Sequence, residues 1–259
     1  MTHTEARNAL RDTMRSRREA LPARARLAAA EAVATHLRAF EPIRGARYVA
    51  GYWAMRGELP LHALLAPPPA FAYCLPCLAP ERELRFAAWR AGDALRTNRY
   101  GIPEPDLAQD ATLAPEALDV VLMPVVAFDR AGTRLGSGAG YYDRSFAFLQ
   151  TMTRPTRPLL VGVAYAFQEA DALRAESWDV ALDFVATEAG LGHLVATRGI
   201  PLVTLAGPTD PVVWRPVTPL WWLVRAQDFG SDRMEAIPVE AVTRALADAL
   251  RWEAGFGLA

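Results

Sequence analysis

The stretch that decides the fold is MPVVAFDRAGTRLGSGAGYYDR, residues 123–144. The apolar run over residues 120–128 predicts a buried strand. A loop follows, with glycines at positions 132, 136, 138 and 140, before aromatic and charged residues resume at Tyr141. A strand, a glycine-rich loop and a helix in this order are typical of a phosphate-binding site.

The loop carries the chemical groups that bind a polyphosphate. Closely spaced glycines permit positive φ and let backbone N–H groups approach a ligand, so that they form a concave nest of donors. A helix that begins near Tyr141 would add the positive end of its dipole. Arg134 offers a forked cation that suits phosphate oxygens, and Asp143 offers the hard oxygen ligand that Mg²⁺ prefers. These residues predict a polyphosphate site with a metal ion.

Glycine spacing alone leaves a second interpretation open, a surface turn with a solvated arginine and aspartate. The pattern is neither the P-loop G-x-x-x-x-G-K-[ST] nor the Rossmann G-x-G-x-x-G. The longer string RLGSGAGYYDR, preceded by PVVAFD, resembles the signature of the 5-formyltetrahydrofolate cyclo-ligase family, also called methenyltetrahydrofolate synthetase. The resemblance implies an ATP- and Mg²⁺-dependent conversion of 5-formyltetrahydrofolate to 5,10-methenyltetrahydrofolate, with release of ADP and phosphate.

The resemblance also implies roles for the loop residues. Arg134 would hold the transferring phosphoryl group, and Tyr141 or Tyr142 would line the formyl pocket. ATP would contact Arg134 and the residues that follow it, Leu135, Gly136, Ser137, Gly138, Ala139, Gly140, Tyr141 and Tyr142. We expect an α/β fold, a three-layer Rossmann-like and mostly parallel sheet flanked by helices, with an extra C-terminal α/β extension.

Upstream of the loop, residues 4–20 and 24–40 predict two helices, the first with Thr4 as its N-cap. Most arginines of the first helix fit a solvated basic face. Arg7 and Arg11 are four residues apart and share one face, so that both can reach one polyphosphate. The family has K-x-x-x-R in this role, and R-N-A-L-R resembles it. The resemblance therefore implies that Arg7 and Arg11 bind ATP.

The next segment carries the expected folate contacts. Residues 47–53 predict a strand, and a loop with Glu58 follows. In the family, a glutamate after this strand contacts the folate and an apolar residue upstream of it packs on the ligand, which are the places of Glu58 and Trp53. Without the resemblance, an exposed loop carboxylate would be the simpler interpretation of Glu58.

Residues 70–78 and 84–89 predict two more strands. The motif C-L-P-C, Cys74 and Cys77, admits a redox pair or half a zinc site, but we favour two small buried thiols on a strand. YGIPEPD, residues 100–106, resembles the family's I-P-E-P segment and predicts an extended loop. Glu104 in this loop either touches the substrate or orients the loop.

Downstream, residues 142–149 predict a helix, 158–165 a buried strand and 170–175 a short helix or turn. SWDVALDFVATE, residues 177–188, resembles the family's closing H-D-x-x-L-D-x-V-x-T-E. Asp179 and Asp183 are both candidates for a second carboxylate on the metal. The resemblance favours Asp179, paired with Asp143, since Mg²⁺ needs few protein ligands when phosphates and water complete its shell.

Chains of this family usually end soon after the T-E, so residues 189–259 lie beyond the resemblance. We therefore expect two domains, 1–188 and 189–259. The extension resembles the C-terminal nucleotide-sugar half of the heptosyltransferase family, and we expect a helix over 191–197, a strand over 201–205, an aromatic run over 214–224 and a helix over 238–252. These make about half of one lobe, so a fused or recombined chain is expected rather than a complete glycosyltransferase. The matching positions are Glu188, Ala189, Gly190, His193, Gly207, Pro208, Thr209 and Asp210.

Composition limits the partners. The 259 residues carry 28 basic and 29 acidic side chains and a net charge of -1, which argues against nucleic acid and anionic membranes as partners. No apolar run approaches the roughly 20 residues of a membrane helix, and the charged N-terminus lacks a signal-peptide core, so we expect a cytoplasmic protein. Reduced folate and ATP are the expected ligands of a monomer or homodimer. A non-catalytic protein that binds folate or nucleotide remains the alternative.

Overall fold

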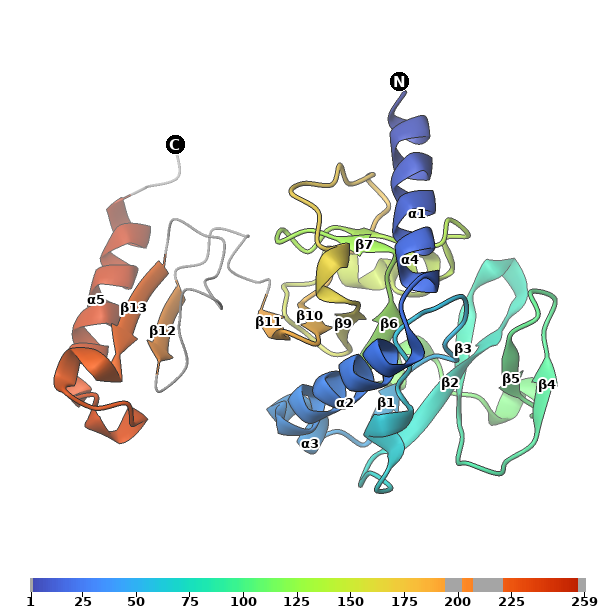
Figure 1. The fold of residues 1–259 in the computed structure, drawn as a ribbon, viewed down its shortest axis with the longest axis horizontal. Helices are drawn as coiled ribbons and strands as arrows, with labels where there is room; N and C mark the ends of the chain where they lie inside the picture. Colours follow the sequence, from blue (N-terminus) through green and yellow to red (C-terminus); the bar gives the residue numbers. More distant parts are fainter. Residues whose placement is uncertain (1, 194–201, 207–220, 256–259) are drawn as a thin grey trace. The chain divides into compact units, whose positions relative to one another are not determined.

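The computed structural model describes residues 2–193, 202–206 and 221–255 (Figure 1). By their contacts the residues divide into two compact units, Met1–Leu191 and Gly192–Ala259. Within the described ranges, no helix has the length and apolar character that crossing a bilayer requires.

The first unit is built on a seven-stranded sheet with the order β11-β10-β9-β6-β1-β2-β3. The four pairings from β10 to β2 are parallel, and β2 pairs with β3 in antiparallel orientation. This sheet confirms the expected mostly parallel α/β fold. The strands are β1 (Tyr48–Ala50), β2 (Ala72–Leu78), β3 (Leu84–Ala88), β6 (Val120–Pro124), β9 (Leu159–Val163), β10 (Phe184–Thr187) and β11 (Gly190–His193).

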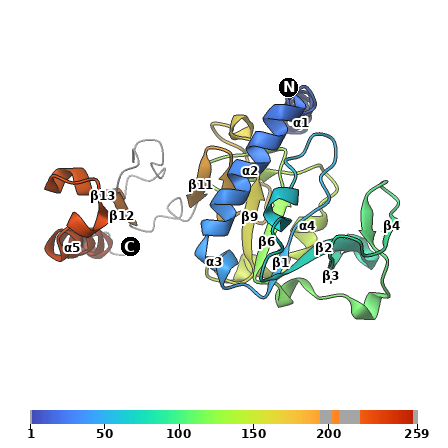
Figure 2. The same ribbon diagram turned by 60° about the horizontal axis from the view of Figure 1, so that its bottom comes forward.

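The central strands are buried on both faces, which explains their continuous apolar runs. On one face, α2 (Ala23–Ala39) lies across the sheet (Figure 2), and its Val33 and Leu37 join one core with Leu122 of β6. On β6 itself, neighbouring residues that point to opposite faces, such as Val121 and Leu122, are both fully buried. α3 (Glu41–Arg44) is a short helix that follows α2.

The first helix, α1 (His3–Glu19), begins one residue earlier than expected and is capped by Thr2 instead of Thr4. The side chain of Thr2 accepts a hydrogen bond from the Glu5 N–H, and the Glu5 carboxylate accepts one from the Thr2 N–H. This capping box satisfies two donors at once, which a cap at Thr4 would leave unpaired. Met14 of α1 packs on Val126 and Leu135, so α1 lies against the segment that leads into the glycine loop.

The strand expected over residues 120–128 is divided in two. β6 ends at Pro124, and β7 (Ala127–Phe128) turns away to pair in antiparallel orientation with β8 (Arg134–Leu135). Proline has no N–H to donate to a ladder, so the strand ends there. Gly132 therefore lies in the β7–β8 turn, with φ of 81°, and is not one of the glycines of the loop.

Three other local expectations needed correction. Residues 100–106 are not a plain loop, since Pro103–Pro105 forms β5, paired with β4 (Leu95–Thr97). Residues 170–175 form neither a helix nor a hydrogen-bonded turn, because the Ala170 and Leu173 N–H groups bond to Phe128 O and Asp129 Oδ2. The helix expected over 142–149 is α4 (Tyr141–Ser145), followed by a 3₁₀ turn at Ala147–Thr151.

The second unit contains β12 (Leu202–Ala206) and β13 (Trp221–Arg225), which are parallel, and the helix α5 (Val239–Gly255). The expected strand and last helix are thus present. The helix expected over 191–197 is wrong over residues 191–193, because Gly190–His193 form β11 of the main sheet after a turn at residues 188–189. Residues 194–197 and the matching positions Gly207, Pro208, Thr209 and Asp210 lie outside the described residues, as does Trp214.

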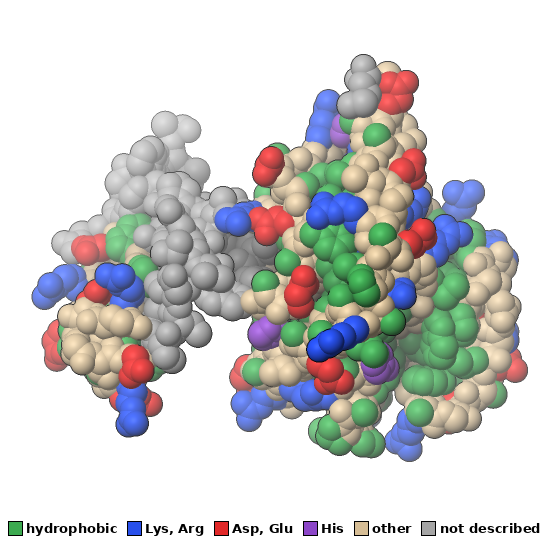
Figure 3. All heavy atoms as spheres, viewed as in Figure 1, with side chains coloured by type: hydrophobic (Ala, Val, Ile, Leu, Met, Phe, Trp, Pro, Cys, Tyr) green, Lys and Arg blue, Asp and Glu red, His purple; other side chains and the backbone are tan. Residues whose placement is uncertain are grey.

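Charged side chains of both signs are interspersed over the visible face of the first unit (Figure 3), in keeping with its near-neutral composition. A strongly anionic ligand must therefore be bound by a local group of cations.

Candidate active site

The glycine loop lies between β8 and α4. Gly138 and Gly140 have φ of 104° and 71°, a backbone region that residues with a Cβ rarely adopt. A Cβ placed on Gly136 would meet no atom within 4 Å, so that side of the loop is open. α4 has only five residues, so the backbone N–H groups of the loop carry more of any anion binding than the helix dipole does.

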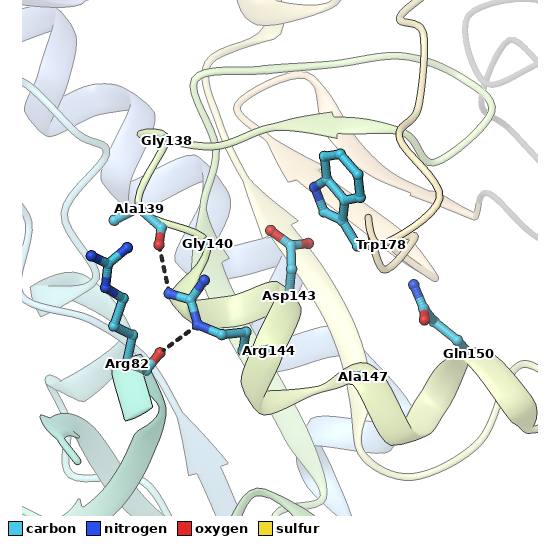
Figure 4. A pocket seen from close by; sticks show the side chains of 9 residues that line it. All are labelled: Arg82, Gly138, Ala139, Gly140, Asp143, Arg144, Ala147, Gln150 and Trp178. Atoms are coloured by element: carbon cyan, nitrogen blue, oxygen red, sulfur yellow. Dashed lines mark hydrogen bonds between the residues drawn. The ribbon is translucent and has the colours of Figure 1, made fainter. Parts of the chain in front are cut away.

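A cavity of about 430 Å³ opens beside this loop. Figure 4 shows the loop, Arg82 and Arg144 on one side, Trp178 and Gln150 on the other, and Asp143 between them. The volume falls within the range of roughly 300–1,000 Å³ that small-molecule sites occupy. The cavity is therefore large enough for part of a nucleotide.

Three arginines, from the two helices α1 and α4, hold the loop in place. Arg11 Nε donates to Gly136 O at 2.9 Å, and Arg15 Nη2 donates to Ser137 O at 3.2 Å. Arg144 Nη2 donates to Ala139 O at 2.6 Å. Burial lowers the pKa of Arg11, and the charges of Arg7 and Arg15 lower it further. Cations crowded on one helix face in this way are stabilised by a bound anion.

Arg134 is engaged with the predicted metal ligand. Its side chain is 7% exposed; Nη2 donates to Asp143 Oδ1 at 2.5 Å and Nη1 donates to Val180 O. Asp143 Oδ1 also accepts the Val180 N–H at 3.2 Å. No local sequence pattern indicated this pair, which ties the glycine loop to the segment after Trp178. The roles of Arg134 in phosphate binding and of Asp143 in metal binding stay predictions.

Asp179 immediately precedes Val180, which contacts both members of this pair. Its Oδ2 accepts the Glu176 N–H at 3.0 Å and pairs with Arg7 Nη1 at 3.4 Å, so Arg7 faces the segment that carries Asp179. Asp183, the other candidate, is 2% exposed and forms a buried ion pair with Arg154. It is therefore a structural residue of the sheet and unavailable as a metal ligand.

The two remaining carboxylates suit Mg²⁺. In the part of the chain that the structure describes, no three His, Cys, Asp or Glu side chains gather as a metal site. Mg²⁺ is usually held by one or two carboxylates together with substrate phosphates and water. Asp143 lines the cavity beside the loop, which is the placement such a site requires.

The expected folate residues follow the carboxyl end of β1. Trp53 is 37% exposed and packs edge-to-face on Trp89, with ring centroids 5.9 Å apart. Glu58 Oε2 accepts the Met55 N–H at 3.0 Å. Burial raises the pKa of Glu58, while this hydrogen bond and the charge of Arg18 oppose the rise. Ligands of open parallel sheets bind at the carboxyl ends of the strands, and Trp53 and Glu58 lie at such an end.

The two tyrosines of the loop have different surroundings. Tyr141 Oη contacts the β4–β5 turn, where it accepts from Arg99 and lies 3.1 Å from Tyr100 Oη. Tyr142 is partly buried; burial raises its pKa, the charge of Glu58 raises it further and Arg134 opposes the rise. Tyr142 is therefore within electrostatic range of both Glu58 and Arg134.

Sequence reasoning missed several residues of this site. Arg15 continues the four-residue spacing of Arg7 and Arg11, and this signal was available. Arg82, Gln150 and Arg99 reach the site only through the fold and left no local pattern. Glu104 proves to orient its hairpin, because it is 3% exposed and accepts hydrogen bonds from Leu78 N, Arg96 and Asn98.

The two cysteines are free and buried on β2, which confirms the interpretation as small buried thiols. Burial raises the pKa of Cys74 to about 12 and that of Cys77 to about 11. Thiols of this kind are protonated near neutral pH and react slowly.

The model of the 5-formyltetrahydrofolate cyclo-ligase family matches residues 3–188. The 5-formyltetrahydrofolate cyclo-ligase of Haemophilus influenzae is 32% identical over 185 residues, which cover 70% of this chain and 96% of that protein. The enzyme of the same name from Escherichia coli K12 is 35% identical over 179 residues, with 67% of this chain and 96% of that protein covered.

Two solved structures are also similar to this chain. The 5,10-methenyltetrahydrofolate synthetase of Aquifex aeolicus aligns with a TM-score of 0.61 at 29% identity, over 73% of this chain and 93% of that one. The synthetase of Mycoplasma pneumoniae aligns with a TM-score of 0.53 at 25% identity, over 70% of this chain and 98% of that one. The chain therefore belongs to the 5-formyltetrahydrofolate cyclo-ligase family.

Proposed function

We propose that this enzyme closes the ring of 5-formyltetrahydrofolate in an ATP- and Mg²⁺-dependent reaction that releases 5,10-methenyltetrahydrofolate, ADP and phosphate. Its family and relatives indicate cyclo-ligase activity. The proposal adds the nucleotide, the metal and the residues that hold them. It also retains the expectations of a cytoplasmic location and of a monomer or homodimer.

The formyl oxygen of the folate is a poor leaving group, so the reaction must first activate it. The formyl oxygen of the folate attacks the γ-phosphorus of ATP, and ADP leaves. The folate N10 then attacks the phosphorylated formyl carbon, the C–O bond breaks, and the N10 proton leaves with the departing phosphate. Mg²⁺ would neutralise phosphate charge when bound by Asp143 and Asp179. Catalysis of this kind depends mainly on positioning and charge stabilisation.

The protein's own residues divide this work. The glycine loop and Arg11 would hold the phosphates, and Arg7 would bind them from the same helix face. Arg134 would hold Asp143 in place, and its position beside the loop would let it act on the transferring phosphoryl group. Trp53 and Glu58 would position the pterin. Tyr142, near both sides, would line the formyl pocket.

The observation that carries the proposal is the position of Tyr142. The charge of Glu58 raises the pKa of its phenol, and the charge of Arg134 lowers it. Segments about 75 residues apart in sequence, roughly 58 to 134, therefore both place a charge within electrostatic range of one phenol. A phosphoryl transfer from nucleotide to folate requires this meeting of the two sites.

The test is the appearance of the methenyl product by its near-ultraviolet absorbance, with pure 5-formyltetrahydrofolate, ATP and Mg²⁺. We expect product only when all three are present. Arg11→Met should raise the KM for ATP by about tenfold or more, since a charge-assisted contact is lost. Arg17→Met, on the same helix and hydrogen-bonded to Phe167 O, serves as the matched control.

Arg134→Ala should abolish turnover, with circular dichroism as a check on folding because the buried pair is also structural. An undiminished rate in a folded Arg134→Ala variant would contradict the role of Arg134. Folate binding by calorimetry without any turnover would instead support the non-catalytic alternative.

A further inference from the structure

An exposed tryptophan faces the cavity beside the glycine loop. Trp178 is 63% exposed and lines this cavity together with Gly138, Gly140 and Asp143. In Figure 4 it stands across the cavity from the loop. Neither the loop chemistry nor the folate contacts use this side chain, so a flat apolar ring faces the cavity without an assigned role.

The backbone that carries Trp178 is held on both sides. Gln150 Nε2 donates to Ser177 O and to Asp179 O, each at 3.3 Å. The Asp179 N–H bonds to Glu176 O at 3.0 Å, and the next N–H, of Val180, bonds to Asp143 Oδ1. The ring is therefore carried on a fixed turn, and the order needed to bind a flat ligand exists before the ligand arrives.

We infer that Trp178 is the platform on which the purine base of the bound nucleotide stacks. The inference rests on the proposed function, in which the loop holds the phosphates. The cavity extends from the loop past Asp143 to Trp178, so a nucleotide with its phosphates on the loop has its base on the tryptophan side. A planar base covers the exposed ring without requiring a hydrogen bond, and such stacking favours any purine about equally.

The folate ring is the competing occupant, and charge argues against it. The cavity is lined by Arg82 and Arg144 at the loop side, which suits phosphates. The residues expected to bind the pterin, Trp53 and Glu58, do not line this cavity. Trp178 is therefore a binding residue for the base of the nucleotide and not for the pterin.

The test compares ADP with inorganic tripolyphosphate, which lacks the base. Calorimetry on the full chain should show that Trp178→Ala weakens ADP binding between about fivefold and about a hundredfold, as expected for one lost base stack. Tripolyphosphate binding should be unchanged. Trp178→Phe should keep most of the ADP affinity. Phe229→Ala, which removes an exposed aromatic ring in the second unit, is the matched control and should change neither.

Three outcomes would overturn the inference. These are unchanged ADP affinity in Trp178→Ala, an equal loss for ADP and tripolyphosphate, and a raised KM for the folate with an unchanged KM for ATP. If the unaltered chain closes the folate ring but Trp178→Ala binds ADP normally, only this inference fails. If the unaltered chain binds neither ADP nor tripolyphosphate and makes no product, the proposed function fails with it.

Discussion

Glu58 is kept in the folded protein at an electrostatic cost. Burial raises its pKa even though Arg18 and the Met55 N–H favour the charged form. Between the ordinary glutamate pKa and the raised one, the folded state binds more protons than the unfolded state, so stability falls as pH rises through this window. At neutral pH the cost is fully present. A partly buried carboxylate retained at such a cost suits a residue that binds substrate.

Replacing Glu58 should therefore separate stability from function. We expect Glu58→Gln to unfold at a higher temperature than the unaltered chain at pH 7, and the difference to shrink as pH falls towards about 4. The KM for the folate should rise by about tenfold or more, because a charge-assisted contact is lost. Thermal unfolding at both pH values and steady-state kinetics measure these effects. Glu83→Gln, at an exposed position, should change neither, and a destabilised Glu58→Gln at pH 7 would show that the sign is wrong.

Asp179 and Asp183 lie four residues apart and should respond in opposite ways. Asp183 accepts from Arg154 Nε at 2.9 Å and from the Leu160 N–H at 2.8 Å, both in a buried setting. Asp183→Asn leaves a buried arginine without its counter-charge and should lower the free energy of unfolding by about 3–5 kcal/mol. Asp179→Asn keeps an oxygen for the Glu176 N–H, so it should retain stability but lose Mg²⁺-dependent turnover.

Urea unfolding and the ring-closure assay, run over a range of Mg²⁺ concentrations, distinguish the two variants. Equal destabilisation of both would mean that Asp179, like Asp183, is a structural residue. A fully active Asp179→Asn variant would remove Asp179 from the metal site.

At the scale of elements, the N-terminal end of α1 matters because this helix carries Arg7 and Arg11. Thr2→Ala removes the capping box and should destabilise the helix start by about 1 kcal/mol. Since Arg7 lies in the second turn, fraying should raise the KM for ATP more than the KM for the folate. Thr13→Ala, in the same helix but away from the cap, should be neutral. An unchanged KM for ATP in Thr2→Ala would show that Arg7 is held by its contact with Asp179 rather than by the helix.

Elements with a clear local period were predictable from sequence, and those set by distant contacts were not. The sequence predicted β6, β9 and the two long N-terminal helices at nearly the right positions. The apolar pattern of their own residues determines where these elements form. Gly132 was misplaced since only the pairing of β7 with β8 shows that it belongs to their turn. The hairpin around Glu104 was missed because Glu104 bonds to Leu78 N, which is distant in sequence, and to Arg96, which no local pattern links to the I-P-E-P motif.

At the scale of the molecule, the sheet order brings the site together. β1 and β6 are neighbours, although about 70 residues separate them, so the loops after both strands emerge at the same edge. The resemblance indicated roles for Glu58 and for the glycine loop separately. That a charge from each segment lies within electrostatic range of Tyr142 follows from this strand order. The pair of Arg134 with Asp143 and the platform of Trp178 were likewise beyond sequence reasoning, since both depend on the turn at Glu176–Asp179.

The boundary between the two units gives the last prediction. The family match ends at Glu188, yet β11 (Gly190–His193) is an edge strand of the main sheet. A chain shortened to end at His193 should retain kcat/KM within about threefold of the full chain, because a domain with its own core folds alone. A chain that ends at Glu188 loses this edge and exposes the ladder groups of β10, so it should unfold earlier and associate. Ring-closure kinetics, thermal unfolding and light scattering on the three chains test this. If the chain ending at His193 folds but is inactive, residues after 193 contribute to catalysis. The second unit would then be required for activity.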